Sequence, residues 1–223
     1  MQNNEKNNLG DKINDFVQNN RKVIFILFGA LFVLFAGTVA YFSISEHLNS
    51  KAILEVEELN SRFESMPLFT EENYFLEEVD ILLADLETFA ASKSGFPGSK
   101  AWSIIGHIYS ARKDWVLAEN AWLNAAKKGN KTYLAPIALF NAAASVEEQG
   151  RPEEAIELLK QCLSHRFEFP AAPRAQFSIG RLYEQLGNYP EALDAYRAVL
   201  INWSEMPVWQ HLARSRIAAI EIR

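Results

Sequence analysis

Cysteine is almost absent from this sequence, which has a single one, Cys162, among 223 residues. One thiol excludes a framework of internal disulfides, so cysteine usage does not separate an oxidising compartment from a reducing one. The neighbours Leu158 and Leu159 place Cys162 in an apolar stretch of an expected helix. We therefore predict a buried thiol rather than one with a redox or intermolecular role.

An excess of basic residues is also missing, because the formal net charge is −6 at pH 7. Residues 1–22 carry four basic and three acidic side chains, which leaves −7 on the rest of the chain. Binding to nucleic acid normally needs a basic surface that neutralises phosphates, and so does docking on an anionic membrane surface. The composition therefore predicts no nucleic-acid partner.

Residues able to carry out chemistry do not form a recognisable constellation. The histidines lack the i, i+4 spacing of a helical metal site and stand far apart, at His47, His107, His165 and His211. The phosphate-binding patterns GxxxxGK and GxGxxG are absent, and adjacent glutamates such as Glu153 and Glu154 diverge on a helix. We predict no catalytic, cofactor or metal site, no small-molecule substrate and no enzymatic activity.

A long uncharged segment runs from Val23 to Phe42 and reads VIFILFGALFVLFAGTVAYF. A helix of this length spans ~30 Å, the thickness of the hydrocarbon core of a membrane. The segment exceeds the ~7–15 apolar residues of a cleavable signal peptide and shows no clear cleavage site, so we predict an uncleaved signal anchor. Four basic residues precede it, which predicts a cytoplasmic tail over 1–22, a periplasmic body and an inner-membrane location. The inverted topology requires this charge rule to fail.

Two apolar stripes between residues 47 and 92 predict a pair of helices. Both have 4-3-4-3 spacing, the first with Ala52, Val56, Leu59, Phe63 and Met66, the second with Phe75, Val79, Leu82, Leu86 and Phe89. The second helix is expected to begin near Glu71. The stripes fit an antiparallel hairpin, as in a degenerate repeat, and they also fit a coiled-coil dimerisation arm. We favour the hairpin, followed by a loop over 93–100 that contains Gly95, Pro97 and Gly98.

Small residues recur every 37 positions in the remaining chain, at Gly106, Ala143 and Gly180 and again at Ala118, Ala155 and Ala192. Large apolar residues follow the second set, a pattern typical of stacked helical hairpins whose paired helices cross closely. We expect the hairpins to begin at Ser99, Pro136 and Pro173. Residues 208–223 predict a capping helix, and we expect its polar face to keep the open end soluble, with Gln210, Arg214 and Glu221.

This pattern resembles the tetratricopeptide repeat over residues 99–207, most closely in the segment GRLYEQLGNYPEALDAYRAVL. The resemblance implies a solenoid of helical hairpins that binds other proteins. Together with the predicted transmembrane helix, it gives an all-α fold with one N-terminal membrane helix followed by the solenoid. The layout of tail, membrane helix and acidic repeat domain also resembles the YfgM-type bacterial inner-membrane proteins, an ancillary part of the Sec translocon. That resemblance implies a role in protein translocation or envelope protein folding, with translocon subunits, periplasmic chaperones or secretory chains as partners.

In this repeat family the first helix of each hairpin lines a concave groove. The matching positions are Lys100, Ser103 and His107; Ile137, Phe140 and Ala144; and Arg174, Phe177 and Arg181. Arginines suit carboxylates and phenylalanines anchor apolar groups, although packing between repeats explains the phenylalanines equally well. The residues that we predict to contact a partner are Lys100, His107, Phe140, Arg174, Phe177 and Arg181. The alternative function is a structural subunit of an envelope assembly, held through residues 47–92.

Overall fold

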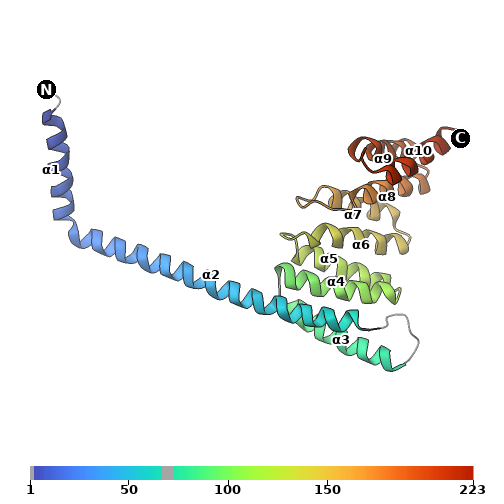
Figure 1. Ribbon diagram of the computed structural model, residues 1–223, viewed down its shortest axis with the longest axis horizontal. Coiled ribbons are helices and arrows are strands. Elements are labelled where there is room, and N and C mark those ends of the chain that lie inside the picture. The colour runs from blue at the N-terminus through green and yellow to red at the C-terminus, as the bar shows by residue number, and fades with distance from the viewer. Residues whose placement is uncertain (1–2, 67–72, 223) are drawn as a thin grey trace. The chain divides into compact units, whose positions relative to one another are not determined.

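The computed structural model of the chain describes residues 3–66 and 73–222, apart from the side chains at positions 3–9, 11 and 73–76. Within these residues the chain is helical and has no strand (Figure 1). The helices are α1 (Asn3–Asn19), α2 (Arg21–Glu64), α3 (Asn73–Ser92), α4 (Gly95–Ala111), α5 (Trp115–Lys128), α6 (Leu134–Glu148), α7 (Pro152–Leu163), α8 (Ala172–Gln185), α9 (Tyr189–Asn202) and α10 (Pro207–Glu221).

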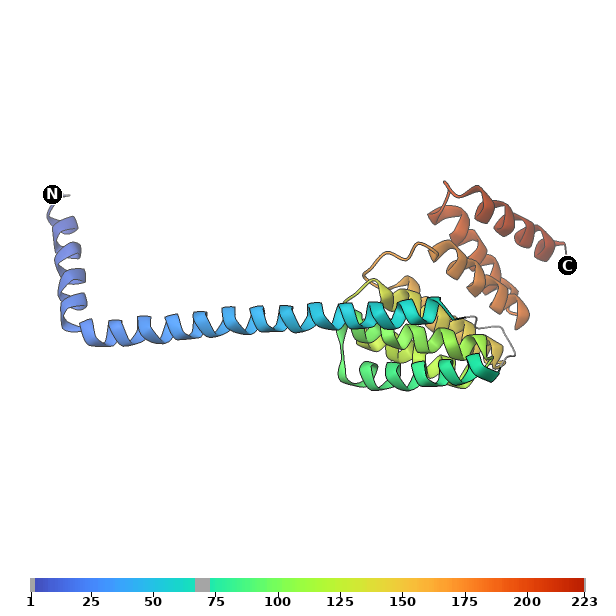
Figure 2. The same cartoon turned by 60° about the horizontal axis from the view of Figure 1, so that its bottom comes forward.

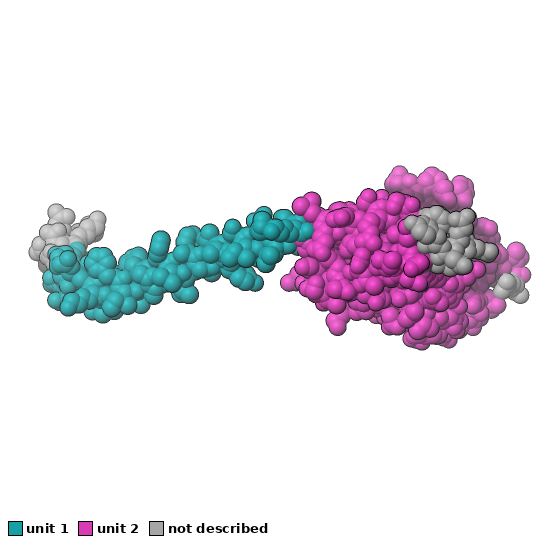
Figure 3. All heavy atoms as spheres, turned by 90° about the horizontal axis from the view of Figure 1, so that it is seen from below, with its two compact units in different colours: residues 1–51 teal, residues 52–223 magenta. Residues whose placement is uncertain are grey.

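The chain divides into two compact units, residues 1–51 and residues 52–223, which Figure 3 colours separately. The first unit contains α1 and the beginning of α2, so the tail predicted over residues 1–22 is largely helical. α2 is long and apolar enough to cross a membrane, and none of its most apolar stretch is buried within the protein.

α2 differs from the prediction of two separate helices over 23–42 and 47–66. It runs without a break from Arg21 to Glu64, and the stripe that begins at Ala52 lies on the same helix as the apolar segment. The reason is local, because Ser43 to Glu46 include neither glycine nor proline and nothing there ends a helix.

The second unit is a stack of helical hairpins. α4 pairs with α5, α6 with α7 and α8 with α9, and α10 packs on α9 (Figures 1 and 2). The end of α2 and the helix α3 pack on α4 through a shared core in which Val56, Leu82 and Ile105 are fully buried. The two apolar stripes therefore meet within one chain. The turn between them and the predicted helix start near Glu71 lie outside the described residues.

Aromatic rings fill the crossing points of the first and third hairpins. Trp122 of α5 lies against Gly106 of α4, and a Cβ added at Gly106 would stand 2.6 Å from the indole ring. Tyr196 of α9 lies against Gly180 of α8 in the same way, where an added Cβ would stand 2.7 Å from the phenol ring. Glycine is needed at both positions because the ring occupies the space that a side chain would take.

α4 begins four residues earlier than predicted, at Gly95 instead of Ser99. Ser99 does not cap the helix but lies fully buried inside it, where its hydroxyl donates a hydrogen bond to the carbonyl oxygen of Ala125, 2.8 Å away. The predicted loop over 93–100 is therefore mostly helix. Gly95 has a left-handed backbone at φ +68°, and Gly98 lets the backbone of Lys93 approach closely.

Of the three polar residues expected on the solvent face of α10, Arg214 and Glu221 are exposed and Gln210 is half-buried. Gln210 donates hydrogen bonds to the carbonyl oxygens of Leu200 and Trp203, and Glu221 accepts one from Arg197 of α9. Arg214 donates a hydrogen bond to the side chain of Gln210 on the same helix and remains exposed. Some apolar side chains at the C-terminal end are exposed as well, among them Val208, Leu212 and Ile222.

Cys162 is buried, and its thiol donates a hydrogen bond to the carbonyl oxygen of Pro136, 3.1 Å away. Burial raises the pKa of this thiol to about 12. Since the thiolate is the reactive form, the geometry makes Cys162 a packing residue of the α6–α7 hairpin.

Candidate protein-binding groove

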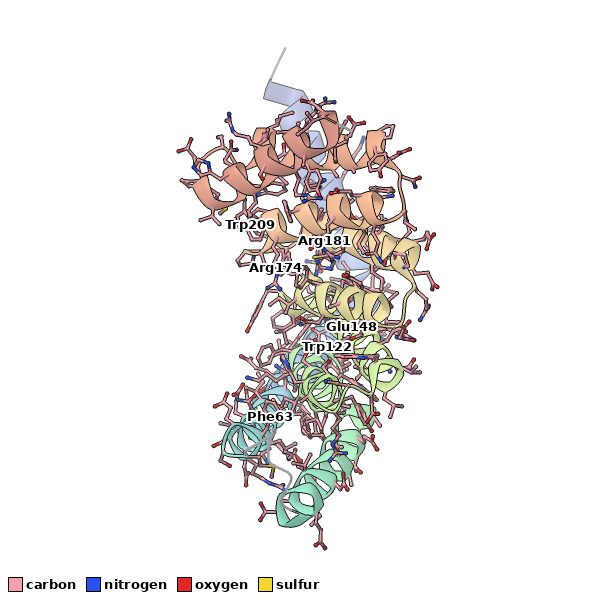
Figure 4. The ribbon with its side chains drawn as sticks, turned by 90° about the vertical axis from the view of Figure 1, so that its right-hand side faces the viewer. Phe63, Trp122, Glu148, Arg174, Arg181 and Trp209 are labelled. Carbon is pink, nitrogen blue, oxygen red and sulfur yellow. The ribbon has the colours of Figure 1, made fainter. Side chains whose placement is uncertain are left out.

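The predicted groove positions lie on the first helices of the three hairpins, α4, α6 and α8. Figure 4 labels Arg174 and Arg181 of α8, with Trp209 of α10 on one side of them along the stack and Phe63 of α2 on the other. Positions 37 residues apart occupy equivalent places, so Lys100, Ile137 and Arg174 form one row and His107, Ala144 and Arg181 another. The rows differ sharply in what surrounds each member.

In the first hairpin, the end of α2 engages both predicted contact residues. Lys100 pairs with the carboxylate of Glu57, 3.2 Å away. The imidazole of His107 is stacked on Phe63 at a centroid distance of 6.2 Å and meets the edge of the Trp122 ring at 4.7 Å. These apolar surroundings desolvate the ring and lower the pKa of His107 below its ordinary value. Lys100 and His107 therefore both contact α2 within the chain, while His107 keeps part of its surface exposed to solvent.

In the third hairpin, Arg174 is exposed and makes no ion pair with any carboxylate of the described residues. Its guanidinium lies over the ring of Phe140, 5.3 Å from the centroid. A cation held against an aromatic face keeps its hydrogen-bond donors available, because the ring satisfies none of them. Arg174 is thus a positioned cation with its donors open to a ligand.

Arg181, about two turns further along α8, is not available in the same way. It pairs with Glu147 of α6 at 2.6 Å, and the hydrogen bond that the guanidinium donates to this carboxylate raises the pKa of Arg181. The pair ties the second hairpin to the third. The sequence predicts the same role for both arginines, but in the structure Arg181 is paired with a carboxylate and Arg174 is not.

Both phenylalanines of the predicted groove are half-buried and pack against other parts of the stack. Phe140 contacts Phe169, which precedes α8, at a centroid distance of 5.3 Å. Phe177 contacts Tyr196 at 5.1 Å and Trp209 of α10 at 5.8 Å. Each ring is wedged between neighbouring elements and still presents part of its surface to solvent, so packing and ligand contact are compatible.

Several residues near the groove are not among those predicted from the sequence. Glu57 and Phe63 come from α2, Glu147 from the end of α6, and Trp209 from α10. The segment between α7 and α8 adds Arg166, whose guanidinium lies 4.7 Å from the ring centre of Phe167. The recurrence of 37 residues could have pointed to Glu147, which is equivalent to Ser110 and Glu184, but no periodic signal connects α2 to the repeats.

A metal or cofactor site is not formed by these residues. Among the residues described, no group of three or more histidine, cysteine, aspartate or glutamate side chains could hold a metal ion. The groove positions offer an arginine and aromatic surface, which are groups enriched at protein–protein interfaces.

Comparison with known proteins agrees with this architecture. The family profile described as tetratricopeptide repeat matches residues 105–164 and 145–207. A "TPR repeat-containing protein" of Treponema pallidum (strain Nichols) is 37% identical over 147 residues, which cover 64% of this chain and 60% of that protein. The chain thus matches less than two thirds of that relative's length.

Two solved structures of a Podosopora anserina protein with nearly identical TPR-like repeats share the fold. Each is 16% identical and covers 74% of this chain, with TM-scores of 0.55 and 0.53 over 85% and 91% of the respective structures. At this identity the likeness concerns the fold alone. The stacked hairpins of residues 105–207 are tetratricopeptide repeats, and such repeats form protein–protein interaction modules.

Proposed function

We propose that this protein is a membrane-anchored module that holds a segment of a partner protein in the groove formed by α4, α6 and α8. The single observation that carries the proposal is Arg174, an exposed guanidinium positioned over Phe140 without a carboxylate partner among the described residues. A positioned arginine beside aromatic surface is the arrangement found at the energetic centre of protein interfaces.

The chemistry of the groove favours a partner segment with a carboxylate and an apolar side chain. Arg174 can donate two parallel hydrogen bonds to a carboxylate, while the exposed parts of Phe140 and Phe177 can receive an apolar group. Ala144 is exposed between them on α6 and leaves room for an extended chain. The segment would lie towards the third hairpin, because Glu57 and Phe63 already engage the first.

The finer proposal concerns the location and the partner. α2 supplies a helix of sufficient length and apolarity to anchor the protein in the inner membrane, and the basic residues before it favour a cytoplasmic N-terminus with the repeats in the periplasm. Anchoring would raise the local concentration of the groove near membrane-embedded partners. This layout supports an accessory role in protein translocation or envelope protein folding, with translocon subunits, periplasmic chaperones or secretory chains as partners.

The test is crosslinking in cells from a photoreactive residue at position 144, followed by mass spectrometry. Position 144 is preferable to Phe177, which packs on Tyr196 and Trp209, because Ala144 is exposed and its replacement disturbs no contact of the core. A photoreactive residue at Gln161, exposed on α7 of the same hairpin, is the matched control.

We expect position 144 to capture translocon subunits, chaperones or secretory chains and position 161 to capture far less. Equal capture from the two positions would remove the groove as the binding site. Capture of one stoichiometric envelope component at both positions would favour a structural subunit instead.

One observation favours that second function. Leu54 of α2 and Ile81 of α3 are apolar and exposed, at 72% and 54% of their surfaces, beside the core that joins these helices to α4. Deleting residues 47–92 would uncover Ile105 and unfold α4, so it cannot test this idea. The double substitution Leu54→Lys and Ile81→Lys can, because a structural subunit would leave its assembly while a groove-binding module would still be crosslinked from position 144.

A further inference from the structure

The helix α1 presents an exposed apolar stripe to solvent. Ile13, Phe16 and Val17 lie on one face, with 57%, 63% and 44% of their surfaces exposed, and Leu9 precedes them by one turn in the sequence. The rest of the helix surface carries polar residues, among them Asn14 and Gln18. A helix with one apolar and one polar face normally buries the apolar face against something.

The joint with α2 keeps this stripe close to the apolar segment. α1 ends at Asn19 and α2 begins at Arg21, and the chain changes direction between them (Figures 1 and 2). Asn20 makes the joint: its backbone N–H and its side-chain amide both donate to the carbonyl oxygen of Phe16, at 3.0 and 2.9 Å. Its own carbonyl oxygen accepts the N–H of Ile24 at 2.9 Å, so Asn20 contributes hydrogen bonds to both helix ends.

Covalent continuity then limits where α1 can be when α2 crosses a membrane. Only four Cα–Cα steps separate Asn19 from Val23, the first residue of the uncharged segment, and they reach at most ~14 Å even when fully extended. The stripe is therefore held within reach of the boundary between headgroups and acyl chains. Arg21 and Lys22, both exposed at the joint, suit the headgroup level next to that boundary.

We propose that α1 is an interfacial helix that lies on the surface of the same bilayer that α2 crosses, with Ile13, Phe16 and Val17 inserted among the lipids. This inference rests on the proposed membrane anchoring by α2 and adds a second membrane contact to it. The occupant of the stripe is lipid because lipid is the apolar phase that the α1–α2 joint brings next to it. An interfacial helix of this kind buries its apolar face ~5–10 Å into the headgroup–acyl boundary.

The test uses the full chain in nanodiscs of phosphatidylcholine and phosphatidylglycerol, with one nitroxide label at a time. Cysteines are introduced at Ile13 and Phe16 on the stripe and at Asn14 and Gln18 on the polar face as matched controls. The native Cys162 can remain, because it is buried and does not compete for the label. Collision rates with oxygen, which concentrates in lipid, and with a water-soluble nickel chelate are measured at each position.

We expect the labels at positions 13 and 16 to report lipid and those at 14 and 18 to report water. Four water-like labels would overturn the inference, and so would dipolar broadening at 13 and 16 from a second copy of α1. A fifth label at Leu34 separates this result from the membrane anchoring itself. If position 34 also reports water, the anchoring by α2 fails; if it reports lipid while 13 and 16 report water, only the inference about α1 fails.

Discussion

In the first hairpin a tryptophan ring fills the space beside Gly106, and in the third a tyrosine ring fills the space beside Gly180. Both rings also use their polar atom. The indole N–H of Trp122 donates to the hydroxyl of Ser110 at 3.2 Å, and the hydroxyl of Tyr196 donates to the carboxylate of Glu184 at 3.2 Å. The two hairpins thus solve the same packing problem with different residues at the same positions.

Their groove surfaces do not match in this way. Lys100 is paired with Glu57 and His107 is stacked on Phe63, whereas the equivalent Arg174 has no carboxylate partner within the described residues. The framework of a repeat is constrained by the crossing of its own two helices, but its surface depends on the preceding helix. The end of α2 contacts the first surface, whereas Arg174 on the third surface has no carboxylate partner within the described residues.

The largest effect should come from breaking the shared framework. An alanine at Gly106 or Gly180 would press its Cβ against the ring, and overpacking of this kind costs up to ~3 kcal/mol, from which ~1 kcal/mol is recovered by better helix propensity. We expect Gly106→Ala and Gly180→Ala each to lower the free energy of unfolding by about 2 kcal/mol. Urea denaturation followed by tryptophan fluorescence measures this change.

The control for this prediction is taken from the middle hairpin, whose equivalent pair is Ala143 and Leu159. Adding Tyr196→Leu to Gly180→Ala recreates that pair and should recover at least about 1 kcal/mol, since residues in contact are coupled. In Gly180→Ala, backbone hydrogen exchange should accelerate more in α8 and α9 than in α4 and α5. Strictly additive effects would show that the ring does not fix the crossing.

The second effect concerns the difference between the two groove surfaces. Reversing the charge of Arg174 removes donors open to a partner carboxylate, and hydrogen bonds to charged groups contribute ~1.5–3 kcal/mol. We expect Arg174→Glu to lower capture from position 144 at least about tenfold, which corresponds to ~1.4 kcal/mol. Lys100→Glu should change capture little, because Lys100 already pairs within the chain.

Thermal unfolding of both variants supplies the control, because the two charge reversals should leave the midpoint almost unchanged. Exposed ion pairs such as Lys100–Glu57 contribute ~0–1 kcal/mol to stability. If Lys100→Glu reduces capture as much as Arg174→Glu does, the first hairpin binds the partner as well and the contrast between the two surfaces is wrong.

The repeat framework was accessible from the sequence because small and large residues recur with one fixed interval. The period of 37 residues locates Gly106 and Gly180, and the structure supplies the rings that require them. The start of α4 could not be predicted from the sequence. Gly95 and Gly98 look like loop residues, but at Gly98 an added Cβ would stand 2.5 Å from the carbonyl oxygen of Lys93, so that glycine serves a close approach inside a helical turn.

The same interval predicted the groove positions, but it did not predict the contacts that these residues make within the chain. The sequence predicts the same role for Arg174 and Arg181, and only the structure shows that Glu147 pairs with Arg181. The contact between Glu57 and Lys100 could not be predicted either, because the interval between these residues is not the repeat interval. Contacts between neighbouring units depend on turn lengths and helix rotation, which local patterns do not encode.

A smaller effect should follow from removing the polar contact of each ring. Tyr196→Phe removes a hydrogen bond to Glu184, whose carboxylate keeps its contact with Arg216, and we expect a loss of about 1 kcal/mol. Ser110→Ala removes the acceptor of the Trp122 indole N–H and should cost a similar amount. Urea denaturation of the two variants measures the free energy of unfolding. A decrease in only one of them would show that the two hairpins share the shape of the ring packing but not its polar contact.

The smallest effect distinguishes the hairpins by pH, since His107 in the first is replaced by Arg181 in the third. Desolvation by Phe63 and Trp122 lowers the pKa of His107 below its ordinary value of 6.5, so the unfolded chain binds a proton more readily than the folded one. Stability should therefore fall as the pH drops through about 6.5, and it should be insensitive to this group at higher pH. His107→Gln keeps a polar, uncharged side chain in that place, and the slope of unfolding free energy against pH should be shallower between about pH 7.5 and 5.5. An unchanged slope would mean that the imidazole is solvated in the folded protein, and that the end of α2 does not cover this part of the groove.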